Sequence, residues 1–174
     1  MLGLTLVYIY RERERERDSV CLSSSKFTAG LGGLVAFGDI AGKVVSVTDG
    51  DTIKVLDRSS MHYTVRLTGI DAPEQDQPYG KSSKEHLASM VAGKEVFVAS
   101  DTSDRYGRLL GKVWVQSSDC ASCGKTLDAN HAQLVAGMAW WYRYYASQQS
   151  PEDRGRYESG EDEARRWKRG LWAA

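Results

Sequence analysis

The segment that decides the fold is Asp49–Glu74, which reads DGDTIKVLDRSSMHYTVRLTGIDAPE. Two alternating apolar stretches in it are typical of β-strands, and acidic residues stand in the turns at their ends. These turn acids are Asp49, Asp51, Asp71 and Glu74. Arg66 stands inside the second stretch, between two apolar residues. The combination suggests a hard metal ion and a phosphate, because calcium takes oxygen ligands and a guanidinium binds phosphate through paired hydrogen bonds.

Three strands are expected in and just before this segment. Val45 and Val47 alternate with polar residues, and residues 53–55 alternate again after the turn dipeptide Asp49-Gly50, which predicts a hairpin. Residues 63–67 form a third alternating strand, in which Arg66 points to the face opposite its apolar neighbours. Two further strands are predicted over Glu95–Ala99 and Leu109–Val115.

Three helices complete the pattern. The first covers residues 84–91, with Ser82 or Ser83 as its cap, and the second runs from Asp128 to Gly137. The third follows the cap Ser150 and has basic residues before Gly170. Its predicted apolar stripe consists of Tyr157, Ala164, Trp167 and Leu171. Five strands, with one helix before the fourth and two after the fifth, predict an α+β fold: a five-stranded OB-type β-barrel with three α-helices.

The bulk composition fits an ordinary globular protein. The chain has 174 residues, of which 41% are hydrophobic and 26% charged, so we expect one domain over residues 40–174. The 23 basic and 23 acidic residues balance, which argues mildly against tight non-specific binding of nucleic acid but leaves room for a local basic groove. No apolar run approaches the length of a membrane span, so we expect no integral membrane protein.

Residues 1–39 have no clear folded pattern. An apolar start, MLGLTLVYIY, precedes the charged run RERERERD, which is the reverse of the order in a secretory signal. A second candidate begins at Lys26 and continues through FTAGLGGLVAF, with Ala36 and Gly38 spaced like a cleavage site. We interpret residues 1–39 either as a disordered tail or as a degenerate signal peptide, with equal weight.

The acids and arginines together predict phosphodiester hydrolysis. Asp51 and Asp71 are the expected carboxylate ligands of Ca²⁺, with the carbonyl of Ala72 beside them, and Asp49 is placed to orient a metal-bound water. Arg66 and Arg108 would offset charge on the phosphate oxygens, while Glu74 would activate the attacking water. For any one aspartate alone, an ordinary turn role is the better interpretation, and for Arg66 a structural carboxylate partner is the alternative.

Five separated motifs carry a resemblance to a known family. They are DGDT at 49–52, VRLTGIDAPE at 65–74, DRYGR at 104–108, AQLVAGMAWWYRYYA at 132–146 and EARRWKRGLW at 163–172. Their order and spacing resemble the thermonuclease (staphylococcal-nuclease-like) family from about residue 40 onward. Several motifs in register are specific, whereas DGDT alone would be weak.

The resemblance implies an OB-fold, calcium-dependent endonuclease that cleaves DNA and RNA and leaves 3′-phosphates. It implies that Asp51, Asp71 and the Ala72 carbonyl bind the metal and that Arg66, Glu74 and Arg108 are catalytic. It further implies that Arg105 and Tyr106 contact a nucleotide phosphate and that Tyr145 lies near the base. A monomer that prefers single strands is expected. The aromatic residues that follow Gly137 could stack unpaired bases, but for most of them packing of the helices onto the barrel is the better interpretation.

Cys120 and Cys123 form a C-x-x-C pattern with several interpretations. A local disulfide is expected if the protein is exported, and two free thiols if it is not; a zinc site would need two more ligands, and His131 supplies at most one. The chain resembles an exported bacterial branch of the family, in which a C-x-x-C precedes the second helix. That resemblance favours the disulfide and a secreted or periplasmic location.

One alternative function stays open at the level of sequence. Related barrels in larger proteins have lost their catalytic residues and act as adaptors that bind nucleic acid or protein. The set Asp51, Arg66, Asp71, Glu74 and Arg108 favours the enzyme, because an adaptor does not need these residues.

Overall fold

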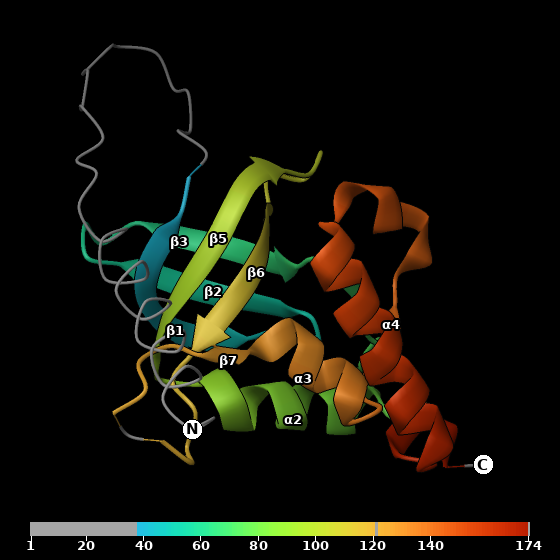
Figure 1. The fold of residues 1–174 in the computed structure, drawn as a ribbon. Helices are drawn as coiled ribbons and strands as arrows, with labels where there is room; N and C mark the ends of the chain where they lie inside the picture. The colour runs from blue at the N-terminus through green and yellow to red at the C-terminus, as the bar shows by residue number, and fades with distance from the viewer. Residues whose placement is uncertain (1–37, 121, 174) are drawn as a thin grey trace, which may run out of the picture. The chain divides into compact units, whose positions relative to one another are not determined.

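The computed structural model describes residues 38–120 and 122–173, and residues 1–37, where the tail or signal peptide was predicted, lie outside it. Five strands form a closed barrel, in which the sheet order β3-β2-β1-β5-β6 is completed by a parallel pairing of β3 with β6. All other pairings around the barrel are antiparallel (Figure 1). The strands are β1 (Ile40–Val47), β2 (Thr52–Asp57), β3 (His62–Leu67), β5 (Glu95–Ser103) and β6 (Leu109–Val115). The predicted five-stranded OB-type barrel is therefore confirmed.

The barrel interior is filled by branched apolar side chains on alternate strand positions. Val44, Ile53, Val55, Val65 and Val98 are all at most 1% exposed. The pattern expected for the first strand was wrong at one position, because Val45 is 46% exposed and its neighbour Val44 points inward. A β-bulge between Val44 and Ser46 shifts the register of β1 against β2, so the inward face changes at that point.

Three α-helices lie against the barrel, as expected: α2 (Gly80–Val91), α3 (Ala129–Val135) and α4 (Pro151–Arg166). Figure 1 shows α2 and α3 below the barrel strands, with α4 beside them. Short elements connect these parts. They are β4 (Ile70–Asp71), which pairs with β8 (Trp140–Trp141), β7 (Leu127–Asp128), which pairs antiparallel with the end of β6, and the 3₁₀ helices η2 (Arg143–Gln148) and η3 (Gly170–Trp172).

The start of α2 differs from the prediction that Ser82 or Ser83 caps it. The helix begins at Gly80, after Tyr79 in the left-handed conformation with φ 66°, and no side chain caps it. A Cβ at Gly80 would lie 1.8 Å from the Glu74 carbonyl oxygen, so the loop before the helix packs tightly on its first residue. Ser83 is consequently inside the helix, where its hydroxyl donates to the Met138 carbonyl at 2.6 Å.

The other two helix starts agree with the sequence. The Asp128 carboxylate accepts a hydrogen bond from the His131 amide at 3.0 Å, and the Ser150 hydroxyl accepts one from the Asp153 amide at 3.0 Å. Trp167 was wrongly placed on the apolar stripe of α4. It is 65% exposed, because α4 ends at Arg166 and the chain turns away there.

The C-terminal segment completes the cap of α3, whose Gln133 and Leu134 carbonyls already accept from the amides of Met138 and Gly137. The Leu171 amide donates to the Gly137 carbonyl at 2.9 Å, and the Arg169 guanidinium donates to the Val135 carbonyl at 3.0 Å. A Cβ on Gly170 would lie 2.2 Å from the Gly137 oxygen, so the two backbones touch. The orphan carbonyls at the end of α3 therefore find partners in the last turn of the chain.

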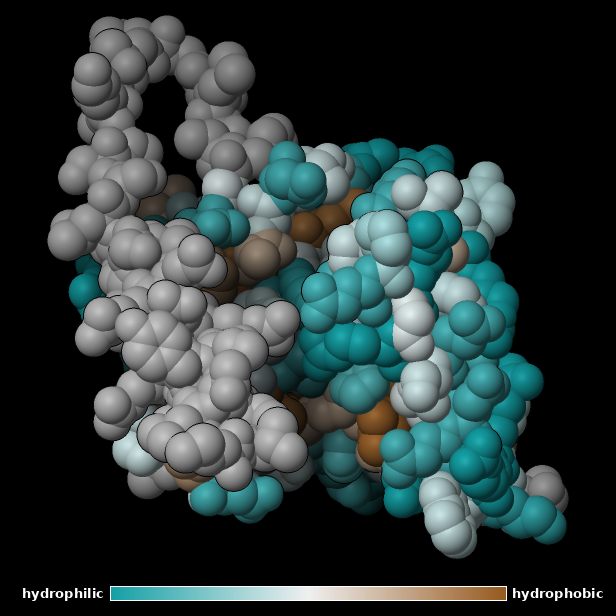
Figure 2. All heavy atoms as spheres, in the orientation of Figure 1, coloured by the Kyte–Doolittle hydropathy of each residue, from teal (hydrophilic) through white to brown (hydrophobic). Residues whose placement is uncertain are grey.

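In residues 38–120 and 122–173 no helix has the length and apolar character needed to cross a bilayer. The coloured surface in Figure 2 is mostly hydrophilic, with apolar residues in small separate areas.

Candidate active site

Arg66 lies between two carboxylates that come from different turns. Its side chain leaves β3 on the face opposite the buried Val65, and its Nη2 donates to Asp71 Oδ1 at 2.8 Å. Its other terminal nitrogen forms an ion pair with Asp51 Oδ2. The Arg66 side chain is 16% exposed and lines the pocket described below, so its positive charge lies close to any ligand bound there. The structure thus brings together three of the predicted residues.

Asp51 is the most deeply buried of the four predicted site acids, at 5% exposure. Its carboxylate accepts hydrogen bonds from the Ala72 amide at 2.7 Å and the Thr52 hydroxyl at 3.0 Å. Burial raises the pKa of Asp51 to about 7, because desolvation outweighs the stabilising Arg66 and Ala72 contacts. Asp49 accepts a hydrogen bond from the Asp51 amide at 3.0 Å, so it fixes the turn that carries Asp51.

Gln133 is a site residue that sequence reasoning missed. It is fully buried, and its amide nitrogen donates to the Gly50 carbonyl at 2.6 Å and to the Ser83 carbonyl at 3.1 Å. Its amide oxygen contacts the ring nitrogen of His86. Gln133 therefore ties the turn between Asp49 and Asp51 to α2 and α3. Only its polar character inside an apolar helix pattern could have signalled it.

Arg108 is positioned by its own turn. The Asp104 carboxylate accepts hydrogen bonds from the Tyr106 amide and the Arg108 amide, both at 2.9 Å, and from Arg108 Nε at 2.7 Å. Burial alone would raise the pKa of Asp104, but the hydrogen bonds from Arg108 and Tyr106 outweigh it and hold this pKa below its ordinary value. Arg105 and Arg108 each lie 5.7 Å from the centre of the Tyr106 ring, which is 75% exposed.

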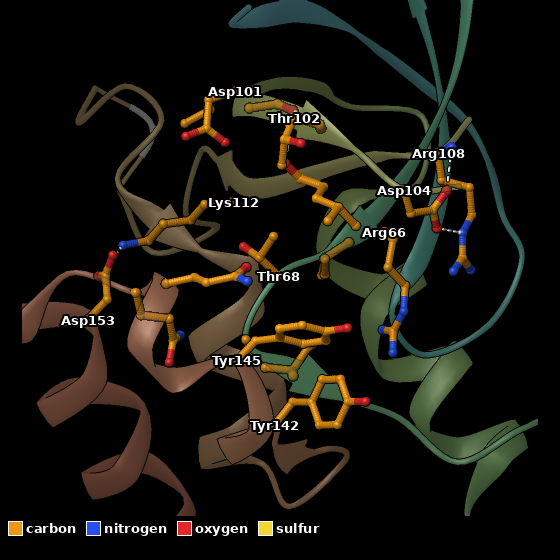
Figure 3. A pocket seen from close by; sticks show the side chains of 18 of the residues that line it. Arg66, Thr68, Asp101, Thr102, Asp104, Arg108, Lys112, Tyr142, Tyr145 and Asp153 are labelled. Atoms are coloured by element: carbon orange, nitrogen blue, oxygen red, sulfur yellow. Dashed lines mark hydrogen bonds and ion pairs between the residues drawn. The ribbon is translucent and has the colours of Figure 1, made fainter. Parts of the chain in front are cut away.

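A pocket of about 1090 Å³ joins these parts. In Figure 3, Arg66 and Arg108 lie on one side of the pocket, the rings of Tyr142 and Tyr145 lie near Arg66, and Lys112 pairs with Asp153 on the other side. The predicted residues that line it are Arg66, Asp71, Arg105, Tyr106, Arg108 and Tyr145. Asp49, Asp51, Ala72 and Glu74 are not in the lining.

Glu74 lies outside the pocket on an exposed loop. Its amide donates to the Gln77 side chain at 2.9 Å, and its carbonyl accepts from the Gln77 amide at 2.9 Å, so the backbone is held by a local turn. Within the described part of the chain its carboxylate forms no hydrogen bond or ion pair. The structure therefore leaves this acid free to take up a proton or a ligand.

The donor set around Arg66 fits a hard cation. Asp51 and Asp71 supply carboxylate oxygens and Ala72 a backbone carbonyl, which is the oxygen chemistry that calcium prefers. Calcium takes about 6–8 ligands, so water and substrate would have to supply the others. In residues 38–120 and 122–173 no three acidic, histidine or cysteine side chains are grouped so that they alone could hold a metal ion. The buried Asp51, with its raised pKa, is a carboxylate that an added positive charge would stabilise.

Cys120 and Cys123 are joined by a disulfide before β7. Their sulfurs are bonded to one another, so they offer no thiolate ligands to zinc. The disulfide does not line the pocket.

Comparison with known proteins gives consistent matches. A family model described as "Staphylococcal nuclease homologue" matches residues 64–174. The chain is 41% identical over 139 residues to a "Micrococcal nuclease" of Shigella flexneri, covering 79% of this chain and 76% of the relative. It is 41% identical over 135 residues to an "Uncharacterized endonuclease" of Escherichia coli, covering 78% of each.

A third relative, "Protein ParB" of Escherichia coli, is 40% identical over 139 residues, covering 79% of this chain and 75% of that protein. The region matched by the family model begins at residue 64. It therefore contains those arginines, acids and tyrosines described above that lie at or after this position. With the closed barrel and these matches together, the chain belongs to the staphylococcal nuclease homologue family.

Proposed function

We propose that this protein is a calcium-dependent endonuclease that hydrolyses phosphodiester bonds of DNA and RNA and leaves 3′-phosphates. The observation that carries the proposal is the pair Arg66, on β3, and Arg108, in the turn directly before the neighbouring β6, which line one pocket beside the carboxylate of Asp71. The nuclease names of the relatives agree with this chemistry.

The two guanidiniums bind the scissile phosphate. Arg108 is held through Nε by Asp104, and its terminal nitrogens form no other ion pair among the described residues. A planar fork with free terminal N–H groups matches two phosphate oxygens. Arg66 adds a second guanidinium charge from β3, beside the two carboxylates that it already holds. Together they offset the charge that grows on the equatorial oxygens during hydrolysis.

The residues that would hold Ca²⁺ are Asp51, Asp71 and the Ala72 carbonyl. The ion would supply Lewis-acid stabilisation of the phosphate charge. Arg66 already holds both carboxylates in place, so the chain orders these ligands before a cation binds.

Glu74 accepts the proton of the attacking water. A bond forms between the water oxygen and phosphorus, and the bond from phosphorus to the 5′-oxygen breaks, so the phosphate stays on the 3′-oxygen. The leaving 5′-oxygen takes a proton from solvent. A carboxylate without a partner on an anchored loop suits this role.

Replacing Glu74 tests the proposal. Glu74→Gln should lower kcat about 10²–10⁴-fold while binding of single-stranded DNA persists, because only the proton acceptor is lost. Cleavage of a fluorescent oligonucleotide with calcium, and with a chelator, measures both requirements. Glu158→Gln, an exposed acid on α4, is the matched control and should cleave like the wild type. Full activity of Glu74→Gln would refute the role of Glu74 as the proton acceptor. Full activity in the presence of chelator would refute the requirement for calcium.

We also propose that the protein acts as a monomer outside the cytoplasm. The Cys120–Cys123 disulfide supports this location, because disulfides persist in oxidising compartments. Cell fractionation and light scattering of the purified chain test the location and the oligomeric state. Recovery of the protein only from the cytoplasm, or as a stable dimer, would contradict them.

A further inference from the structure

Gln133 on α3 connects two helices to the turn that carries Asp51. Its side chain is fully buried, and its Nε2 donates to the Gly50 carbonyl at 2.6 Å and to the Ser83 carbonyl at 3.1 Å. Figure 1 shows α2 and α3 side by side below the barrel strands, so one amide reaches both the neighbouring helix and the turn. Gly50 stands directly before Asp51, and Gln133 therefore fixes the backbone from which this carboxylate projects.

His86 determines which way round the Gln133 amide lies. The carbonyls of Gly50 and Ser83 both need a donor, so the NH₂ group faces them and the amide oxygen faces His86 Nδ1. An amide oxygen only accepts hydrogen bonds, and His86 Nδ1 therefore carries a proton and donates it. Without that donor the buried oxygen would have no partner among the described residues, which favours rotation of the amide away from Gly50.

Helix α2 packs closely on both acidic loops of the site. A Cβ on its first residue would lie 1.8 Å from the Glu74 carbonyl oxygen, and a Cβ on Gly50 would lie 1.8 Å from the Ser83 hydroxyl. The helix therefore supports the loop that carries Glu74 and contacts the turn that carries Asp51. The hydrogen bond from Gln133 to the Ser83 carbonyl joins this support to α3.

We infer that Gln133, oriented by His86, is a positioning residue that holds the Asp51 turn against α2 and thereby sets the affinity of the site for calcium. The inference rests on the proposed function for the role of Asp51 as a calcium ligand. Neither Gln133 nor His86 lines the pocket, so both act through the backbone and not by touching the substrate. A ligand that is held in place beforehand loses less conformational freedom when a cation binds, which favours binding.

Substitutions of His86 test the inference with little risk to folding, because His86 is only partly buried. His86→Phe removes the donor at Nδ1, whereas His86→Asn keeps an N–H donor near the same position. His62→Phe is the matched control, since His62 is exposed at the start of β3. Only His86→Phe should change the turn.

Nitrogen-15 relaxation of the calcium-free protein measures the turn directly, because backbone order parameters describe the folded state alone. In His86→Phe the order parameters of the Asp51 and Ala72 amides should fall from about 0.85 toward about 0.6, while that of Gly107 in the loop between β5 and β6 stays unchanged. His86→Asn and His62→Phe should match the wild type at all three amides. A rigid turn in His86→Phe, or an equal fall at Gly107, would overturn the inference.

Calorimetric titration with calcium alone gives the second readout. At a temperature where every variant is folded, a loss of global stability leaves the Kd for calcium unchanged, so a merely structural role predicts no effect. His86→Phe should bind calcium about five- to tenfold more weakly, somewhat less than the 10–100-fold loss typical when a direct partner of a metal ligand is removed. His86→Asn and His62→Phe should stay within about twofold of the wild type.

The two readouts separate this inference from the proposed function. Calcium binding by His86→Phe that equals binding by the wild type would overturn the positioning role. If the wild type bound no calcium, the proposed function would lose its cation, and the order parameters would then decide the inference. A turn that loosened only in His86→Phe would leave positioning by Gln133 standing.

Discussion

The two loops that carry the charged residues of the site are held in opposite ways. The loop between β1 and β2, residues 48–51, is fixed from outside by Gln133 and by Gln75, whose side chain donates to the Thr48 carbonyl at 2.6 Å. The loop between β5 and β6, residues 104–108, is fixed from within by Asp104. The acid of the first loop, Asp51, is buried, whereas the hydrogen-bonded turn of the second loop lies at the surface. A site can therefore combine one loop that depends on the whole fold with one that depends only on itself.

The largest expected effect is on pH dependence, which should have opposite signs in the two loops. The pKa of Asp51 is raised to about 7 in the folded state, so its stabilising contribution is present below about pH 4 and lost as pH rises through 7. A rise of about three pKa units corresponds to at most about 4 kcal/mol. The pKa of Asp104 is lowered, so its contribution is present above about pH 4 and lost as pH falls.

Urea unfolding of the chelated protein from about pH 2 to about pH 9 measures both slopes. Asp51→Asn should flatten the decline toward neutral pH, and Asp104→Asn should flatten the decline toward acid. If Asp51→Asn kept the wild-type slope between about pH 5 and about pH 8, the raised pKa of this buried acid would be wrong.

The next largest difference is expected from a glycine-to-alanine substitution in each loop, which should destabilise the first loop more than the second. A Cβ at Gly50 would lie 1.8 Å from the Ser83 hydroxyl and 2.7 Å from Ala72 Cβ, so Gly50→Ala should lower the free energy of unfolding by about 3 kcal/mol. Gly107 has φ +76°, and a Cβ there would meet nothing within 4 Å, so Gly107→Ala should cost only about 1 kcal/mol of backbone strain. Thermal unfolding compares the two, and equal losses would contradict the external packing of the first loop.

Of the two side-chain hydrogen bonds that hold the first loop, the buried one should contribute more to the free energy of unfolding than the exposed one. Gln133→Leu leaves the Gly50 carbonyl without its donor and should cost about 2 kcal/mol of stability. Gln75→Leu removes an exposed hydrogen bond to the same loop and should cost less than about 1 kcal/mol. Denaturant unfolding of the two variants gives the comparison. The reverse order would show that the loop is held from the solvent side.

The smallest effect is expected on kcat/KM, when the second loop holds Arg108 less firmly. Asp104→Asn weakens the hold on Arg108 Nε, so kcat/KM on single-stranded DNA with calcium should fall about tenfold, or about 1.4 kcal/mol. Asp101→Asn is the matched control, since Asp101 lines the same pocket without binding Arg108, and it should not lower kcat/KM. A loss in the control equal to that in Asp104→Asn would assign the effect to pocket charge instead of arginine orientation.

The contrast also explains what the sequence could predict. The turn DRYGR holds all partners of Asp104 within four residues, and local spacing is what a single sequence displays. The hydrogen bond from Gln133 to Gly50 joins residues 83 positions apart, so no local sequence pattern can predict it. The barrel and the three helices followed from periodicity and from the family resemblance. The errors at Val45, Ser83 and Trp167 arose from a bulge, a tight loop and a helix end, which depend on the folded neighbours.

The contact between Gly137 and Gly170 has a consequence for synthesis of the protein. Ribosomes release a chain from its N-terminus onward, and domains can begin to fold during that release. The carbonyl of Gly137 receives its partner only when Leu171 has emerged. All five barrel strands are available well before that point, but the carbonyls of Val135 and Gly137 still lack the partners that Arg169 and Leu171 supply. Acquisition of the finished fold is therefore tied to the arrival of the residues around Leu171.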